Sequence, residues 1–345
     1  MNGYTSTQDD LNDDNHLKEQ NGSTPFSGDV PSSPTGTFST FSMTSTVNDR
    51  IFREDGGRRF QAQNDDYSLP NDEQELERLE CQHRAFKAVQ ANRNYLAPVH
   101  DNLKDGSRAL DIGCGTGVWT IEMAEEFPKV EWIGIDLAPV QRDIGLPDNL
   151  HFEQNDITQG LPFPDESFDL VHARLLVMGI RDWKATLDEL LRILKHGGMV
   201  CMIECDFPWG LPGVPEDQWK ERAPGHCIFS DYLKMAVEKR GYDHKAASRT
   251  IAALMRASGK VKDVDQIESC LPLWGWSDDP DLRRSGETMR ADAEEIPNSV
   301  KIVIQDACEI PEEVYEEIKN GYLADLGKPG AHTAVPIVHN YGWKY

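Results

Sequence analysis

The chain has 345 residues, and its 59 acidic and 35 basic side chains give a formal net charge of −24. A surface this negative repels phosphate backbones and argues against a general nucleic-acid binder. No apolar run approaches the roughly 18 residues that span a bilayer, and residues 1–10 lack the basic start and apolar stretch of a signal peptide. The seven cysteines are scattered and lack partners at zinc-site spacing. We therefore expect a soluble, cytoplasmic protein without a metal site.

The first 60 residues differ in composition from the rest of the chain. Most residues between Asn21 and Thr46 are Ser, Thr, Gly or Pro, and the few apolar ones show no period. Such a segment buries too little surface to offset its ordering entropy, so we expect residues 1–60 to be a disordered tail. Arg50, Arg53 and Arg58–Arg59 form a thin basic patch, which favours an ordinary charged stretch and leaves a nuclear address as the alternative.

Periodic order begins near Tyr67, and we expect one domain over residues 67–345. A helix opens after Pro70, with Asn71 or Asp72 as its cap. Buried strands then alternate with helices, which predicts a doubly wound, mostly parallel sheet as a core over residues 105–206. The predicted strands are 108–112, 131–136, 150–153, 168–173 and 199–204, and the helices are 116–126 and 183–194, the second closed by 195–198.

Residues 207–345 read as a helical lid with closing strands. Helices are predicted at 229–240 and 246–257, and a sixth strand at 261–271. Two acidic helices follow, 287–295 and 298–308, because Pro297 is expected to divide them. Another helix opens at Pro311. A closing strand is predicted at 334–341, where Pro336 requires an edge or bulged position.

The most informative motif is the loop at residues 110–117, Leu-Asp-Ile-Gly-Cys-Gly-Thr-Gly, between the first core strand and helix. Its glycines allow a tight turn and close approach of a ligand. Asp111 ends the strand just before the first glycine; a carboxylate there would repel a pyrophosphate and attract an ammonium group. The spacing also differs from the Gly-x-Gly-x-x-Gly pattern of nicotinamide-binding folds.

Two further acids end successive strands. Asp136 ends the second strand about twenty residues after the loop, where a carboxylate can accept from two ribose hydroxyls. Asn155, Asp156 and Ile157 follow the third strand, where Asp156 can accept from an adenine amino group while Ile157 packs on the ring. Each acid alone is more often a strand-end cap. Three in the crevice where doubly wound sheets bind ligands favour a binding site.

With these motifs, the sequence resembles the class I S-adenosylmethionine-dependent methyltransferases, and more closely the fungal LaeA-like methyltransferases. The resemblance extends from Tyr67 to Tyr345 and includes the 111–117 loop, Ile135–Gln141 and Phe168–Arg174. It also includes flanking pieces at 67–83, 182–183, 194–198, 276–286 and 332–344. Cys114 departs from the usual loop sequence Gly-Thr-Gly-Thr-Gly, and the acidic stretch 291–295 leaves the form of the lid open.

The resemblance implies a Rossmann-like sheet of seven strands with the last one antiparallel, helical lid insertions and S-adenosyl-L-methionine as cofactor. The residues then expected to bind the cofactor are Tyr67, Asp111, Gly113, Gly115, Asp136, Leu137, Asn155, Asp156, Ile157 and His172.

Methyl transfer releases a neutral thioether, so alignment and desolvation can supply most of the catalysis and no fixed triad is expected. The candidates for contact with the reacting groups are His172, Arg174 and Glu204, near the ends of strands four and five. His172 is as well explained as a hydrogen-bonded core histidine. Arg174 is better suited to a cofactor carboxylate or substrate than to a base.

Two functions remain open at this stage. The first is an enzyme that methylates an O or N acceptor on a small molecule in fungal secondary metabolism. The second is a LaeA-like regulator that acts through velvet-type protein partners in secondary metabolism and development. The disordered tail suits the regulator, whereas the elaborate lid suits a small substrate. We favour the enzyme.

Overall fold

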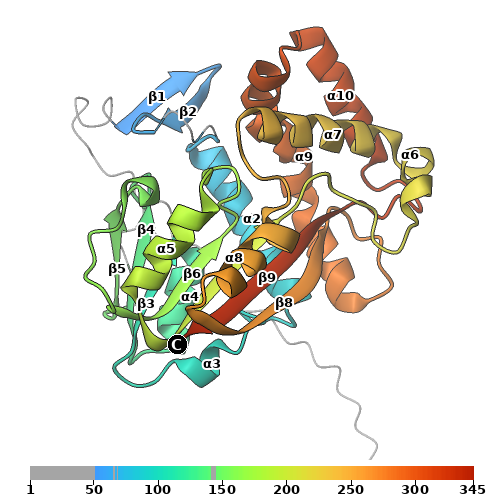
Figure 1. The fold of residues 1–345 in the computed structure, drawn as a ribbon. Helices are drawn as coiled ribbons and strands as arrows, with labels where there is room; N and C mark the ends of the chain where they lie inside the picture. The colour runs from blue at the N-terminus through green and yellow to red at the C-terminus, as the bar shows by residue number, and fades with distance from the viewer. Residues whose placement is uncertain (1–50, 65–66, 68, 141–144) are drawn as a thin grey trace, which may run out of the picture. The chain divides into compact units, whose positions relative to one another are not determined.

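A sheet of seven strands organises the structure. In the computed structural model, residues 51–64, 67, 69–140 and 145–345 are described. The strand order is β5-β4-β3-β6-β7-β9-β8 (Figure 1). The strands are β3 (Arg108–Ile112), β4 (Glu131–Asp136), β5 (Leu150–Gln154), β6 (Phe168–Arg174), β7 (Leu194–Cys205), β8 (Val261–Pro272) and β9 (Ala334–Lys344).

Strand directions confirm the expected fold class. The pairs β3–β4, β4–β5, β3–β6 and β6–β7 are parallel, whereas β9 is antiparallel to both β7 and β8. In β3, residues 109–112 are all buried, as expected for a strand with helices on both faces of its sheet. The sheet is a doubly wound one whose last strand in the chain runs antiparallel.

Helices cover the sheet and extend beyond its β8–β9 side (Figure 1). Asp72 caps α2 by accepting from the Glu75 amide at 3.0 Å, and Asp182 caps α5 by accepting from the Ala185 amide at 2.8 Å. The helices are α2 (Glu73–Val89), α3 (Val99–Asn102), α4 (Val118–Glu126), α5 (Trp183–Ile193), α6 (Trp219–Arg222), α7 (Pro224–Lys239), α8 (Ile251–Ala257), α9 (Pro280–Cys308) and α10 (Glu312–Asp325).

The expected division at Pro297 is wrong, because α9 is one helix of 29 residues that passes through it. Proline has no N–H and leaves the carbonyl four residues earlier without its helical donor. Here the hydroxyl of Tyr322, in α10, donates to that carbonyl, Ala293 O, at 3.1 Å. The hydroxyl of Tyr315 donates to the carbonyl of Pro297 itself. Tertiary hydrogen bonds thus replace the bond that the proline removes.

Two further expectations are refined at strand ends. Residues 195–198 belong to β7 rather than to a turn that closes α5, and β7 starts at Leu194, which pairs with Phe168. Pro336 lies in a strand inside the sheet. The pairing of β9 with β7 ends at Ile337, and Pro336 is the residue just before it in the chain. At Pro336, β9 therefore pairs only with β8. The edge-like position expected for this proline is confirmed.

The expected disorder of residues 1–60 is wrong for its last part. Strands β1 (Phe52–Asp55) and β2 (Arg58–Gln61) pair as an antiparallel hairpin. Phe52 and Phe60 are buried, and the guanidinium of Arg59 lies 4.4 Å from the ring centroid of Phe52. So short a hairpin has no periodic signal in the sequence and depends on tertiary contacts for its stability. Residues 1–50 lie outside the described residues.

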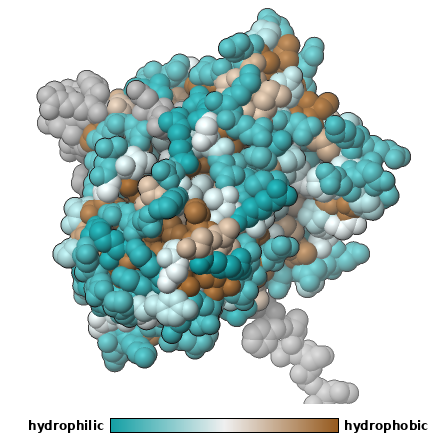
Figure 2. Space-filling model, in the orientation of Figure 1, coloured by the Kyte–Doolittle hydropathy of each residue, from teal (hydrophilic) through white to brown (hydrophobic). Residues whose placement is uncertain are grey.

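The surface bears out the polar composition. The face shown in Figure 2 is largely hydrophilic, with small separate hydrophobic groups. Among the described residues, none of the helices is both long and apolar enough to cross a membrane.

Candidate active site

A cavity of about 240 Å³ lies at the carboxyl ends of the parallel strands. Its wall includes the loop after β3, the ends of β4 and β5, the loop after β6, the residues after β7, and parts of α2, α7 and α9. The first residues of β9 and the end of β8 complete it. The strand order reverses between β3 and β6, and ligands of doubly wound sheets bind at such a switch point.

The loop after β3 requires glycine at specific positions. Gly113 has φ +65°, and a Cβ there would lie 2.3 Å from Cδ2 of Leu176 in the loop after β6. Gly115 has φ +57° and only Leu79 Cδ1 near the Cβ position, at 3.4 Å. Both glycines line the cavity. The loop therefore brings its backbone to the cavity and packs directly against the loop after β6.

Asp136 combines a capping role with a place in the cavity wall. One carboxylate oxygen accepts from the Gly115 amide at 2.8 Å and the other from the Ala138 amide at 3.0 Å. Burial raises the pKa of this carboxyl, and the two backbone hydrogen bonds oppose the rise. A carboxylate has about four acceptor positions, so roughly two remain for hydroxyl donors.

A short strap formed by Asn64, Tyr67 and Leu69 joins the hairpin to α2 and lines the cavity. Asn64 donates from Nδ2 to Asp156 Oδ2 at 3.0 Å, while Oδ1 of Asp156 accepts from the Thr158 amide at 2.9 Å. A Cβ on Gly179 would lie 3.4 Å from the Tyr67 ring, so the strap reaches the loop after β6. Leu137, Asn155 and Ile157 also line the cavity, as expected.

Asp111 and His172 are not among the residues that line the cavity. Both are 3% exposed, and His172 Nδ1 lies 2.7 Å from Asp111 Oδ1. Thr120 donates to the other oxygen of Asp111 at 2.5 Å. The imidazole stacks on Trp119, with ring centroids 3.6 Å apart, and burial lowers its pKa. The structure thus corrects the expected position of both residues: they form a core cluster beneath the glycine loop.

Arg174 does line the cavity. Its guanidinium carbon lies 4.9 Å from the ring centroid of Phe86, and burial lowers its pKa. Among the residues that the structure describes, no carboxylate lies within ion-pair distance of it. A partly buried guanidinium with no ion pair is costly even though Asp111 and Glu122 act on it from a distance, which favours an anionic ligand group at this position.

Glu204 is the second-last residue of β7 and is fully buried. Its two oxygens accept from the amides of Leu176 and Val177, at 2.7 and 3.1 Å. Burial raises the pKa of this carboxyl to about 8. Glu204 is not in the cavity wall, whereas Leu176 and Val177 are. Glu204 therefore does not line the substrate space as expected. It instead fixes the backbone of the loop after β6, which does line the cavity.

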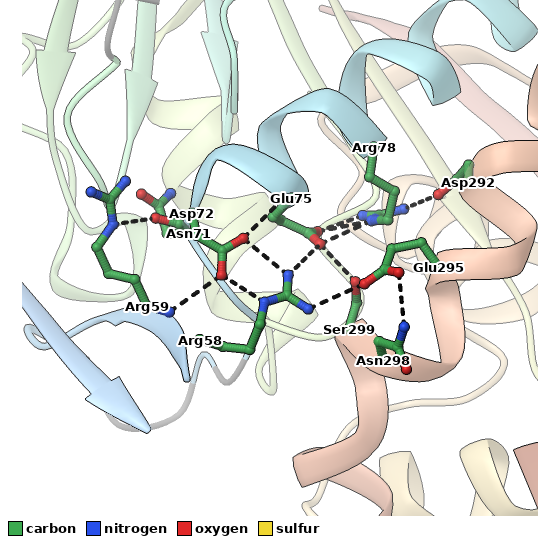
Figure 3. A network of polar contacts seen from close by, with 10 residues as sticks. All are labelled: Arg58, Arg59, Asn71, Asp72, Glu75, Arg78, Asp292, Glu295, Asn298 and Ser299. Carbon is green, nitrogen blue, oxygen red and sulfur yellow. Dashed lines mark hydrogen bonds and ion pairs between the residues drawn. The ribbon is translucent and has the colours of Figure 1, made fainter. Parts of the chain in front are cut away.

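A polar network joins α9 to α2 and the hairpin (Figure 3). Arg78 donates from Nη2 to Glu75 at 2.6 Å and from Nη1 to Asp292 at 2.7 Å. Ser299 donates to Glu75 at 2.8 Å. Arg58, from β2, donates to the α2 cap at 2.6 Å and to Glu295 at 3.3 Å. Charges from three elements thus hold α9 across the cavity.

The cavity end under α9 is apolar. Its side chains come from elements far apart in sequence and are all buried. Trp274 and Trp276 are not in the cavity wall. The side chains at this end include Phe207, Trp209, Leu233, Met289, Val300 and Ile337.

Sequence reasoning missed Asn64 and the whole contribution of α9. The motif around residues 67–83 contains Glu75 and Arg78, but nothing local connects them to Asp292 or Ser299, more than 200 residues later. Only the contact between α2 and α9 brings these groups together.

Comparison with known proteins agrees with this geometry. A protein-family model described as "Methyltransferase domain" matches residues 103–244, which include the glycine loop, Asp136, Asp156 and Arg174. Over these residues, which hold most of the cavity's polar lining, the chain is therefore similar to a methyltransferase domain.

The chain is also similar in sequence to fungal proteins named as methyltransferases or as secondary metabolism regulators. It is 40% identical over 145 residues to the secondary metabolism regulator laeA of Coprinopsis cinerea, covering 41% of this chain and 36% of that protein. It is 27% identical to methyltransferase str3 of Strobilurus tenacellus, over 65% of this chain and 76% of that one. It is 28% identical to the secondary metabolism regulator LAE1 of Cochliobolus heterostrophus, over 64% and 70%.

Proposed function

We propose that this protein transfers a methyl group from S-adenosylmethionine to an oxygen or nitrogen acceptor on a small molecule of fungal secondary metabolism. The observation that carries the proposal is the two-part cavity. One part is polar and built on the glycine loop and Asp136, and the other is apolar and lies under α9. The two kinds of lining would place the reacting groups of a cofactor and an acceptor next to each other.

The residues of the polar part suit the groups of the cofactor. Asp136 has acceptor positions left for the two ribose hydroxyls. Asp156 has acceptor capacity for the adenine amino group, and Leu137 and Ile157 offer apolar surface to the ring. Arg174 would pair with the methionine carboxylate, which would supply the partly buried guanidinium with an ion-pair partner.

The bound cofactor supplies a methyl group on a positively charged sulfur. The chain's own contribution is to hold the acceptor in line with that group and to keep water out. Alignment and desolvation of this kind are worth up to roughly 7–11 kcal/mol. The loop after β6 lies between the polar and apolar parts, so Glu204, which fixes its backbone, acts as a positioning residue.

Turnover of cofactor with a labelled methyl group, with an extract of fungal metabolites as acceptor, tests the proposal. We expect label in low-molecular-weight products. Label found only on protein, or cofactor binding without any transfer to small molecules, would contradict it.

A regulatory role through velvet-type protein partners is the second candidate, supported by the relatives named as secondary metabolism regulators. The acidic surface suits basic protein partners. In that role the protein would work in the cytoplasm or the nucleus. Capture of a velvet-type protein by the full chain, with no methyl transfer to metabolites, would favour this role over the enzyme.

A further inference from the structure

The apolar end of the cavity limits what the acceptor can be. Side chains from β9, α7, α9 and the segment after β7 surround it, and the six that define it here are Phe207, Trp209, Leu233, Met289, Val300 and Ile337. Each is at most 6% exposed. We call this part of the cavity the apolar chamber.

The chamber offers little to a charged ligand. In the described part of the chain, the charged side chains of α2 in the cavity wall are Glu75 and Arg78, and these are bonded to each other. Glu75 also accepts from Ser299, and Arg78 also donates to Asp292. A charged acceptor would lose its hydration without gaining a free counter-ion at this end.

The form of α9 explains how a single helix lines much of the chamber. Because α9 continues through Pro297, Met289 and Val300 lie on one helix and face the same cavity, eleven residues apart. The network of Figure 3 holds this helix against α2. A Lys or Arg side chain of a protein substrate would have to place its charge among these apolar side chains.

We propose that the chamber binds the methyl acceptor and selects an uncharged, largely apolar small molecule, such as an aromatic or terpenoid scaffold, with Met289 and Val300 setting its size. The inference rests on the proposed function and narrows its substrate class. Burial of apolar surface supplies the affinity, and the polar part of the cavity remains for the cofactor.

Two probes of similar shape and different charge test the selection. Calorimetry would measure 2-naphthol and 6-hydroxynaphthalene-2-sulfonate binding to the full chain saturated with S-adenosylhomocysteine. We expect the neutral probe to bind at least tenfold more tightly than the sulfonate. Equal affinities, or tighter binding of the sulfonate, would overturn the proposal.

Variants locate the binding. Val300→Trp fills the chamber and should weaken 2-naphthol at least tenfold, while S-adenosylhomocysteine affinity stays within about twofold and thereby shows that the domain is folded. Met289→Ala enlarges the chamber and should improve binding of a bulkier probe, 4-phenylphenol, relative to 2-naphthol. The control is Met235→Trp on the exposed face of α7, 40% exposed, which should change neither ligand.

The outcomes separate the two proposals. If S-adenosylhomocysteine binds and Val300→Trp leaves 2-naphthol affinity unchanged, the chamber inference is wrong and the methyltransferase function stands. If the unaltered chain does not bind S-adenosylhomocysteine, the proposed function fails, and the chamber inference falls with it.

Discussion

Asp136 and Asp111 show how differently two strand-end carboxylates can be used. Asp136 accepts two backbone amides and still lies in the cavity wall. Asp111 has both oxygens engaged, by His172 and Thr120, in the core. Replacement of Asp136 should therefore lower both the affinity for the ligand and the stability of the fold.

Asp136→Ala should weaken S-adenosylmethionine by roughly 2–4 kcal/mol, or about 30- to 1,000-fold, because hydrogen bonds to a charged acceptor are lost. It should also lower stability without ligand, since the Gly115 and Ala138 amides lose their acceptor. Asp136→Asn should give an intermediate loss of affinity. Calorimetry and ligand-free melting curves measure both effects.

The matched control for these variants is Asp188→Ala, which removes an exposed ion pair to Lys184 and should change neither quantity appreciably. Unchanged cofactor affinity in Asp136→Ala would refute the assignment of Asp136 to the cofactor.

Glu204 makes stability depend on pH. Its folded-state pKa is about 8, raised by burial above the ordinary glutamate value. The folded protein therefore holds the proton more tightly than the unfolded chain, and stability falls as pH rises from about 4.5 to 8. Glu204→Gln, which does not titrate, should flatten this dependence. Denaturant unfolding at pH 5.5 and pH 8 measures the free energy of unfolding of the unaltered protein and of Glu204→Gln. An equal change in this free energy between the two pH values for both proteins would contradict the expectation.

Helix α9 shows that an element can be continuous where its sequence predicts a break. A proline in mid-helix costs about 3 kcal/mol or more. Two tyrosine hydroxyls from α10 offset part of that cost here, because they donate hydrogen bonds to the carbonyls of Ala293 and Pro297. The same helix supplies the wall of the cavity, so the compensation at Pro297 has a functional consequence.

A double-mutant cycle tests the compensation. Tyr322→Phe should destabilise the protein by about 1–2 kcal/mol, because the Ala293 carbonyl is left buried without a donor. In a Pro297→Ala background the same change should cost less than about 0.5 kcal/mol, since the new amide at 297 can donate to that carbonyl. Denaturant titration measures each free energy of unfolding. Additive effects would show that the tyrosine does not replace the missing helical bond.

At the scale of the whole described unit, polar contacts join the hairpin, α2 and α9 beside the cavity. Arg58 lies at the centre of it, bonded to Asp72 and Glu295. The segment that contains Arg58 was expected to be a solvated tail. Its removal should therefore affect the site, whereas removal of the residues before it should not.

Deletion of residues 1–50 should leave the melting temperature and cofactor affinity unchanged, because their composition offers no periodic apolar face. Deletion of residues 1–61 removes the hairpin and Arg58. It should cost on the order of 2 kcal/mol of stability, from lost hydrogen bonds between charged groups. It should also weaken the cofactor, because the Asn64 amide, which donates to Gln61 Oε1 at 2.8 Å, loses that partner. Calorimetric melting and cofactor titration compare the two truncations, and identical results would mean that the hairpin does not support the site.

The sequence by itself determined the core strands, a helix cap at Asn71 or Asp72, the glycine loop and the acids at the strand ends. These features depend on local periodicity, capping and turn chemistry, which act over a few residues. Asp136, Asp156 and Arg174 lie in the cavity wall because their strands end at its edge.

Tertiary structure alone decided the rest. Whether a strand-end side chain faces the cavity or the core depends on what packs beside it, so Asp111, His172 and Glu204 differ from Asp136 for reasons that no spacing reveals. The unbroken α9 depends on hydroxyls from another helix, and the short hairpin depends on an arginine bonded to residues far along the chain. Contacts between segments more than 200 residues apart leave no local pattern, and it is these contacts that close the cavity.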